Sequence, residues 1–328
     1  MTTRKVMIVG LGKRVREVAL PAFARAADAY AVVDVRARTA RPAAGGLPEV
    51  RALEALKGEE LAEIDLVYVA VGKPAVPDVL ARLGRYDRGR LELLIETPVL
   101  VAKQFRAAAS LDGWRKVTVA EDCARLPWYD VVRAASASWL GTVREVEFAH
   151  SAWKYHGLAM LKALLGDERI RRARRIGPVD GGRREFVFAG GGRGTVLEPR
   201  DYATGSFTVV GEGGRLSDAP ADGAVRLEAL LEGDRVRGFA AGEARTTLDD
   251  DEVALQEARP AAAGVTARME DWKRIGLLRL LRELAADGPG YPVARGLDDM
   301  LVDDLLDRIG RASSLGVGLL KRLARLPR

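Results

Sequence analysis

The stretch Val6-Met7-Ile8-Val9-Gly10-Leu11-Gly12 decides the fold expected for this chain. Four apolar residues in a row predict a short buried strand, and two glycines follow at its end. A helical pattern then runs from about residue 15 to residue 27, so the glycines occupy a turn between a strand and a helix. This order is typical of the start of a dinucleotide-binding, or Rossmann, domain.

Strand and helix signals continue to alternate over the first 120 residues. Further strands are expected at residues 31–35, 66–71, 91–95 and 117–120, and a short helix near 51–57. Strands that alternate with helices predict right-handed βαβ crossovers and a parallel sheet. We therefore expect a Rossmann-like domain over residues 1–122.

The pattern changes after residue 122, where strand candidates follow one another with glycine-rich turns. They lie at residues 143–150, 185–188, 206–210, 225–231 and 236–240. Such a succession predicts an antiparallel sheet. Helical patterns cover residues 127–139, 268–286 and 296–311. We expect an α/β protein whose second domain, residues 123–328, is an α+β domain with an open, mostly antiparallel sheet.

The composition excludes several classes of protein. The 328 residues are 48% hydrophobic and 30% charged, which is typical of a globular chain. No apolar run has membrane-spanning length, the N-terminus leads directly into a strand, and the single cysteine, Cys123, excludes an internal disulfide. We expect a cytoplasmic protein.

The net charge of +6 is spread along the chain. Its densest cluster, Arg171-Arg172-Ala173-Arg174-Arg175, has no interleaved aromatic residues, and we interpret it as a solvated loop or strand edge. Neither nucleic acid nor a membrane is expected as a partner.

The glycine loop has the composition of a cofactor site. Gly10 permits a tight turn, and Gly12 lets the backbone approach a pyrophosphate. Lys13 and Arg14 complete the loop that we expect to hold the cofactor, and Val15 takes the place of the usual third glycine.

The nature of the dinucleotide depends on the second strand. Asp34 lies 24 residues after Gly10, where an acidic residue usually bonds the adenosine ribose, whereas Arg36 and Arg38 are suited to a 2′-phosphate. NAD and NADP both stay open, and the arginines tilt the choice toward NADP. The alternative is a Rossmann-like scaffold that binds no nucleotide.

Several segments, weak singly, are ordered and spaced as in one family. They are Val6–Gly12, Val69–Pro74, Glu96–Pro98, Val119–Asp122, Leu140–Val146, His156–Gly166, Val209–Leu216 and Gly296–Ser313. Together they resemble the glucose–fructose oxidoreductase, inositol dehydrogenase and MocA (Gfo/Idh/MocA) group over nearly the whole chain. The resemblance implies a two-domain NAD- or NADP-dependent oxidoreductase, with Val71, Glu96 and Pro98 at the cofactor and Thr97 at the substrate.

The chain departs from this family at two site positions. The group usually reads Glu-Lys-Pro where this chain reads Glu96-Thr97-Pro98, and the resemblance places that lysine between the nicotinamide and the substrate hydroxyl. Thr97 cannot carry its charge. The group also has an aspartate three residues after its histidine, where this chain has Ala159, so the motif is degenerate and His156 alone remains.

His156 is the expected acid–base group. A position in the first turn of a helix disfavours the charged imidazolium, and a neutral imidazole can accept a proton from an alcohol. If residues 154–156 are extended, Lys154 points the same way as His156 and replaces the missing lysine, with Tyr155 as a weaker candidate. The alternatives are a structural histidine and a solvated lysine.

Two acidic residues follow the fifth strand, at the sheet edge where ligands bind in such folds. Glu121 and Asp122 are expected to contact the substrate or a ribose, although Asp122 is equally suited to cap a helix. Two histidines and one cysteine without ligand spacing predict no metal site.

These observations predict hydride transfer between a nicotinamide and a small-molecule substrate: a sugar, a cyclitol or a related hydroxyl or carbonyl compound. The alternatives are a redox-neutral reaction assisted by the cofactor, a non-redox reaction, or a binding scaffold. The family resemblance also implies a homo-oligomer formed through the open face of the C-terminal sheet.

Overall fold

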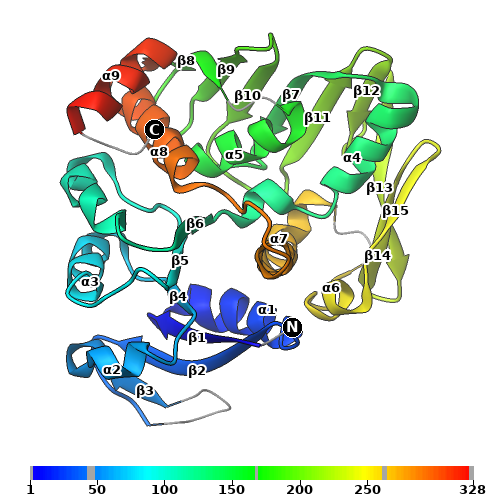
Figure 1. Ribbon diagram of the computed structural model, residues 1–328. Coiled ribbons are helices and arrows are strands. Elements are labelled where there is room, and N and C mark those ends of the chain that lie inside the picture. The colour runs from blue at the N-terminus through cyan, green and yellow to red at the C-terminus, as the bar shows by residue number, and fades with distance from the viewer. Residues whose placement is uncertain (1–2, 43–48, 167–168, 261–263, 325–328) are drawn as a thin grey trace. The chain divides into compact units, whose positions relative to one another are not determined.

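The computed structural model describes residues 3–42, 49–166, 169–260 and 264–324 (Figure 1). The chain forms two compact units. The first comprises the residues up to Glu121, Leu277–Met300 and the residues from Leu320; the second comprises Asp122–Gly276 and Leu301–Leu319. This division differs from the expected one because two C-terminal segments belong to the first unit.

The first unit is built on a parallel sheet of six strands in the order β3-β2-β1-β4-β5-β6. The strands are β1 (Arg4–Val9), β2 (Tyr30–Ala37), β3 (Val50–Ala52), β4 (Leu66–Val69), β5 (Glu92–Glu96) and β6 (Lys116–Ala120). Helices α1 (Leu20–Arg25), α2 (Gly58–Leu61) and α3 (Val76–Leu83) lie between them in the chain. All four residues of β4 are buried, as expected of a strand covered on both faces.

One strand of this sheet was not expected. Residues 51–57 were predicted to be helical, but Val50–Ala52 pairs with β2 as β3 and is followed by a single 3₁₀ turn, Leu53–Ala55. A three-residue edge strand with a charged middle residue, Arg51, lacks the apolar run that reveals a buried strand.

The second unit is built on a sheet of ten strands in the order β15-β14-β13-β12-β11-β7-β10-β9-β8-β16. The strands are β7 (Val143–Ala149), β8 (Ile170–Ile176), β9 (Arg183–Phe188), β10 (Arg193–Leu197), β11 (Ser206–Gly211), β12 (Gly214–Ser217), β13 (Ala224–Glu232), β14 (Arg235–Ala241), β15 (Ala244–Thr247) and β16 (Arg311–Ser313). Neighbours are antiparallel except β7 with β10 and β12 with β13. The expected mostly antiparallel sheet is confirmed.

Helices cover part of the second sheet. α5 (Lys154–Leu165) packs against β7 and β10, and α4 (Tyr129–Ala135) packs against β14 and β15 (Figure 1). The remaining helices are α6 (Asp250–Ala254), α7 (Met269–Ala285), α8 (Val293–Ile309) and α9 (Ser314–Ala324). Among the described helices, none is both long enough and apolar enough to cross a membrane.

The arginine cluster at residues 171–175 is part of a strand. It forms most of β8, which pairs with β9 and β16. Ile170 and Ala173 are buried while Arg171, Arg172 and Arg174 are exposed, so the arginines lie on the solvent side of the strand. The cluster therefore lies neither in a loop nor at the sheet edge, but on a strand paired on both sides, most of whose arginines are solvent-exposed.

Candidate functional site

The glycine loop of the first unit has the form that its sequence predicts. Gly10 has a φ of +113°, and a Cβ there would overlap the carbonyl oxygen of Ala70, so only glycine fits. The Gly10 amide donates to the Arg36 carbonyl at 2.7 Å, which fixes the loop to β2. A Cβ on Gly12 would meet no atom within 4 Å. The loop therefore leaves open space beside Gly12, where a ligand can approach the backbone.

The predicted cofactor residues near this loop divide into two groups. Arg14 donates to Glu96 at 2.9 Å, and the Tyr68 hydroxyl donates to the same carboxylate, so Glu96 is held beside the loop. Lys13 is exposed and pairs with Glu17 at 3.6 Å. For the other residues of this region the structure gives only their burial. Val71 and Thr97 are half-buried, whereas Pro98 and Val15 are buried.

The position of Asp34 does not support its predicted contact with a ribose. β1 and β2 pair in parallel with Met7 opposite Asp34, so Asp34 lies three residues, about 10 Å along the strand, before the level of Gly10. Its carboxylate is buried and bonds Arg36 at 2.7 Å and Arg51 at 2.8 Å. The spacing of 24 residues along the sequence misplaced Asp34 because β2 continues to Ala37.

Arg36 is equally unsuited to the 2′-phosphate role predicted for it. Its side chain is 1% exposed and also pairs with Glu60 at 2.7 Å, so two carboxylates compensate its charge. Arg38, one residue beyond β2, is exposed. Of the two arginines, Arg38 is the one that a ligand can reach.

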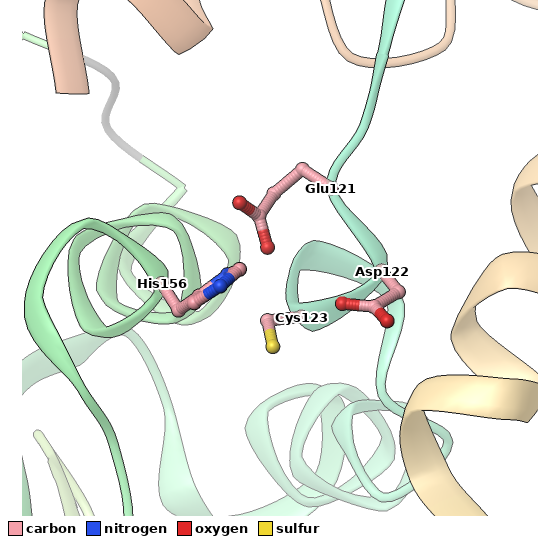
Figure 2. A group of neighbouring side chains, drawn as sticks. All are labelled: Glu121, Asp122, Cys123 and His156. Atoms are coloured by element: carbon pink, nitrogen blue, oxygen red, sulfur yellow. The ribbon is translucent and has the colours of Figure 1, made fainter. Parts of the chain in front are cut away.

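The second unit brings three chemically active side chains together. Asp122 and Cys123 begin the 3₁₀ turn Asp122–Arg125, and His156 lies in the first turn of α5. Each offers an atom within 4.8 Å of the others (Figure 2, where Glu121, the buried residue before Asp122, is also drawn). Asp122 is 2% exposed and Cys123 is 1% exposed. Two of the residues predicted to form the site, Asp122 and His156, are thus neighbours.

A lysine that the sequence analysis missed joins this group. Lys273 on α7 has a side chain 11% exposed and donates to Glu270 at 3.0 Å. Burial alone would lower the pKa of Lys273, but its interactions with Cys123, Tyr202 and Asp122 outweigh burial, and the pKa is raised. Lys273 therefore remains a cation at neutral pH.

The packing of α7 brings Lys273 to this place. A Cβ on Gly276 would overlap the carbonyl oxygen of Asp122, so the glycine lets the helix approach the turn closely. In the sequence, Lys273 lies four residues after Met269 and four before Leu277, both buried. A charged residue within an apolar helical stripe was the signal that could have identified it.

Aromatic rings and cations extend the group. The guanidinium carbon of Arg200 lies 4.9 Å from the ring centre of Trp153 and 5.4 Å from that of Tyr202. The ammonium of Lys273 lies 5.1 Å from the ring centre of Tyr202. The Trp153 ring in turn lies 6.3 Å from the Tyr155 ring.

These contacts return to His156, because the Tyr155 ring lies 4.3 Å from the imidazole. The neighbours therefore form a closed circuit within the second unit. Its members, in order, are His156, Tyr155, Trp153, Arg200, Tyr202, Lys273 and the adjacent pair Cys123 and Asp122. We call this set the second-unit circuit.

Lys154 contacts the circuit only at Trp153, with its ammonium 5.7 Å from the centre of that ring. It is the first residue of α5, with a φ of +46°, and the extended backbone that would align it with His156 is not formed. Its ammonium pairs with Asp307 at 3.1 Å. Burial opposes its charge, but Asp307 outweighs burial and raises the pKa of Lys154. The structure therefore does not support its predicted substitution for the missing lysine.

The circuit offers donors for a metal as well as for acid–base chemistry. A histidine, a thiol and a carboxylate are ligands that transition metals accept. Lys273, however, already supplies positive charge to Cys123 and Asp122. A protonated lysine and a bound cation would compete for the same negative groups, so the arrangement favours an imidazole paired with a fixed ammonium.

Comparisons with known proteins identify the fold. No protein-family model matches the sequence, and no curated protein matches it. Solved structures do match, at low sequence identity. An aldose-aldose oxidoreductase from Caulobacter crescentus, complexed with glycerol, has a TM-score of 0.64 and 15% identity, over 95% of this chain and 100% of that chain.

Two further structures show what else this fold carries. A levoglucosan dehydrogenase in complex with NADH and L-sorbose has a TM-score of 0.61 and 14% identity, over 93% of this chain and 95% of that chain. The transcriptional regulator Gal80p from a Kluyveromyces lactis source has a TM-score of 0.62 and 12% identity, over 92% and 91%. The chain thus has the two-part α/β fold of the Gfo/Idh/MocA-type oxidoreductases that its sequence resembles.

Proposed function

We propose that this protein is an oxidoreductase that uses a nicotinamide dinucleotide and acts on a small hydroxylated substrate, a sugar, a cyclitol or a related compound. The observation that carries the proposal is that an imidazole, His156, lies beside Cys123 and Asp122 and that the ammonium of Lys273 interacts with the same two residues. The similarity in fold to an aldose-aldose oxidoreductase and to an NADH-bound levoglucosan dehydrogenase supports it.

The first unit has residues that fit a dinucleotide. Gly10 makes the turn at the end of β1, and Gly12 leaves space beside the backbone that any larger residue would fill. When bound, the nicotinamide supplies the two-electron chemistry, as a hydride acceptor or donor. Arg38 is the residue that would favour NADP over NAD, because Arg36 is already paired.

The second-unit circuit supplies the proton chemistry. As the substrate carbon loses hydride, its hydroxyl proton passes to the imidazole of His156, and the carbonyl forms; in the reverse direction His156 returns the proton. Lys273 keeps its proton and stabilises negative charge that develops on the substrate oxygen. Lys273 thus supplies a positive charge of the kind that the usual lysine carries and Thr97 lacks.

A binding titration tests the proposal. NADH and NADPH are titrated into the purified protein, and tryptophan quenching and energy transfer to the nicotinamide are followed. We expect micromolar binding of at least one of them and its loss in Gly12→Val, whose circular dichroism spectrum should match that of the wild type. Arg38→Met, a matched surface variant, should weaken NADPH and leave NADH unaffected.

The roles in the second unit are tested by kinetics on the substrate found in a screen of polyols. His156→Asn should lower kcat by about 10²- to 10⁴-fold without changing dinucleotide affinity. Lys273→Met should lower kcat, whereas Lys273→Arg should recover part of it. Absence of dinucleotide binding at millimolar concentration in the folded protein would overturn the proposal and leave a binding scaffold.

A further inference from the structure

Arg200 has an environment that differs from that of a structural arginine. It follows β10 in the chain and is exposed, yet Trp153 and Tyr202 hold its guanidinium at 4.9 Å and 5.4 Å from their ring centres. Within the described part of the chain, this guanidinium forms neither an ion pair nor a hydrogen bond. Its N–H donors are therefore not used by any residue that the structure describes.

The two aromatic rings fix the arginine without compensating its charge. A cation over an aromatic face gains about 0.5–1 kcal/mol at an exposed site, which is enough to favour one orientation of the side chain. A planar fork that is already oriented loses less entropy when it binds two oxygens side by side. Packing between Trp153 and Tyr202 thus prepares Arg200 to bind a carboxylate or a phosphate.

A second cation lies on the same aromatic ring. Lys273 contacts Tyr202 at 5.1 Å from its ring centre. The charge of Lys273 is partly compensated, because Glu270 accepts its hydrogen bond at 3.0 Å and Asp122 is near. The excess of positive charge in the circuit therefore lies on the Arg200 side.

The circuit also connects Arg200 with the acid–base group. Trp153, which contacts Arg200, lies beside Tyr155, and Tyr155 lies beside His156. All of these residues belong to the second unit. Arg200 and His156 are therefore connected through two neighbouring aromatic rings, Trp153 and Tyr155.

We propose that Arg200, held between Trp153 and Tyr202, binds an anionic group of the substrate, a carboxylate or a phosphate, at a carbon remote from the one that is oxidised. The inference rests on the proposed function only in assigning the ligand as the substrate. The substrate class is then a sugar acid or a sugar phosphate rather than a neutral polyol.

The test compares three ligands of one carbon skeleton without dinucleotide. Gluconate, glucitol 6-phosphate and neutral glucitol are titrated against the protein, with tryptophan fluorescence as the signal and Trp153→Phe to identify its source. One of the two anions should bind at least about tenfold more tightly than glucitol, because a charge-assisted hydrogen bond of this kind supports such a ratio. Whichever anion binds more tightly identifies the group.

Variants assign the preference to Arg200. Arg200→Met should reduce the preference for the anion to near unity, while Arg200→Lys, which keeps the charge but not the fork, should retain part of it. Arg193→Met on β10 removes one exposed positive charge equally and should leave the preference unchanged. The preference of the wild-type protein should also fall as salt is added.

Each outcome decides between the two proposals. Equal affinity for gluconate, glucitol 6-phosphate and glucitol, or an unchanged preference in Arg200→Met, would overturn the anion site even if NADH binds. A preference that depends on Arg200 in a protein that binds no dinucleotide would retain the anion site and overturn the oxidoreductase. Tight binding of an anion together with NADH or NADPH supports both.

Discussion

Arg36 in the first unit and Arg200 in the second both follow the pattern of an arginine near the end of a strand, but their environments are opposite. Arg36 is 1% exposed and its guanidinium is shared between Asp34 and Glu60. Arg200 is exposed, and it packs between two aromatic rings instead of two carboxylates.

Compensation of charge, rather than position in the sequence, thus separates a structural arginine from one that binds a ligand. An arginine whose N–H donors already bond buried carboxylates has no donor available for a phosphate. An arginine held by aromatic faces keeps its donors available. Measurements of stability test this distinction, because only an arginine paired with buried carboxylates should contribute strongly to the free energy of unfolding.

The largest effect is expected at Arg184, a buried arginine of the second unit. It is 1% exposed and pairs with Glu198 at 3.1 Å, Asp303 at 2.7 Å and Asp307 at 2.6 Å. Arg184→Met should lower the free energy of unfolding by about 3–5 kcal/mol, since three carboxylates lose their shared partner. Urea unfolding followed by circular dichroism measures the change. A loss below about 1 kcal/mol would break the proposed link between compensation and stability.

Arg36→Met should lower the free energy of unfolding by about 3 kcal/mol. The effect is at the lower end of the range expected for Arg184→Met because Asp34 keeps Arg51 as a partner. The matched control is Arg38→Met, on the same chain segment but exposed, which should change the unfolding free energy by less than about 0.5 kcal/mol. If the two variants were equally stable, the charge of Arg36 would be available after all, and its predicted role at a 2′-phosphate would return.

Asp218 provides the corresponding test for a carboxylate. The Phe207 amide donates to it at 2.7 Å, and no ion pair of Asp218 forms among residues 3–42, 49–166, 169–260 and 264–324. Burial raises the pKa of Asp218 to about 6 from its ordinary 3.8, despite backbone hydrogen bonds that lower it. The folded state thus holds this proton more tightly than the unfolded state does.

The sign of the pH effect follows from this difference. The contribution of Asp218 to stability is complete below about pH 4 and is lost as the pH rises through 6. Between pH 5 and pH 8 the loss should be about 1–2 kcal/mol. Asp218→Asn, which has no proton to lose, should show a flatter dependence when unfolding is measured at both pH values. An identical dependence in the variant and the wild type would contradict the assignment.

The smallest effect is expected at Arg200. Arg200→Met should lower the free energy of unfolding by no more than about 1 kcal/mol, the value of an exposed cation–π contact. The same urea titration measures it beside Arg184→Met. A loss comparable to that of Arg184→Met would show that Arg200 is structural and would remove the basis of the anion site.

Much of the fold could be predicted because parallel and half-buried strands leave direct signals in the sequence. The apolar run of β4 and the alternation in β7 are examples. β3 and β8 escaped because arginines interrupt their apolar residues, and only pairing with β2 and β9 reveals them as strands. The local pattern of apolar and polar residues does not show which distant segments form hydrogen bonds with each other.

The sequence could predict only those residues of the candidate site whose role follows from their own local segment. His156 and Asp122 could be named from their places after a strand and at a helix start. Lys273 and Arg200 could not, because they join the circuit through contacts between segments far apart in the chain. Asp34 fits the motif by its distance from Gly10, but strand register places it opposite Met7, so its contact with a ribose stays a prediction. The catalytic role of His156 and the expected oligomer remain predictions.

The closed circuit has a consequence for how the substrate preference of such a protein could change in evolution. Most of its members stand on helices or beside the turn at Asp122, where Gly276 leaves no room for rearrangement. Arg200 comes from the connection between β10 and β11, and its guanidinium packs on Trp153 and Tyr202. Substitution of Arg200 alone could therefore change the substrate preference to a neutral sugar, while the residues that transfer the proton stay the same.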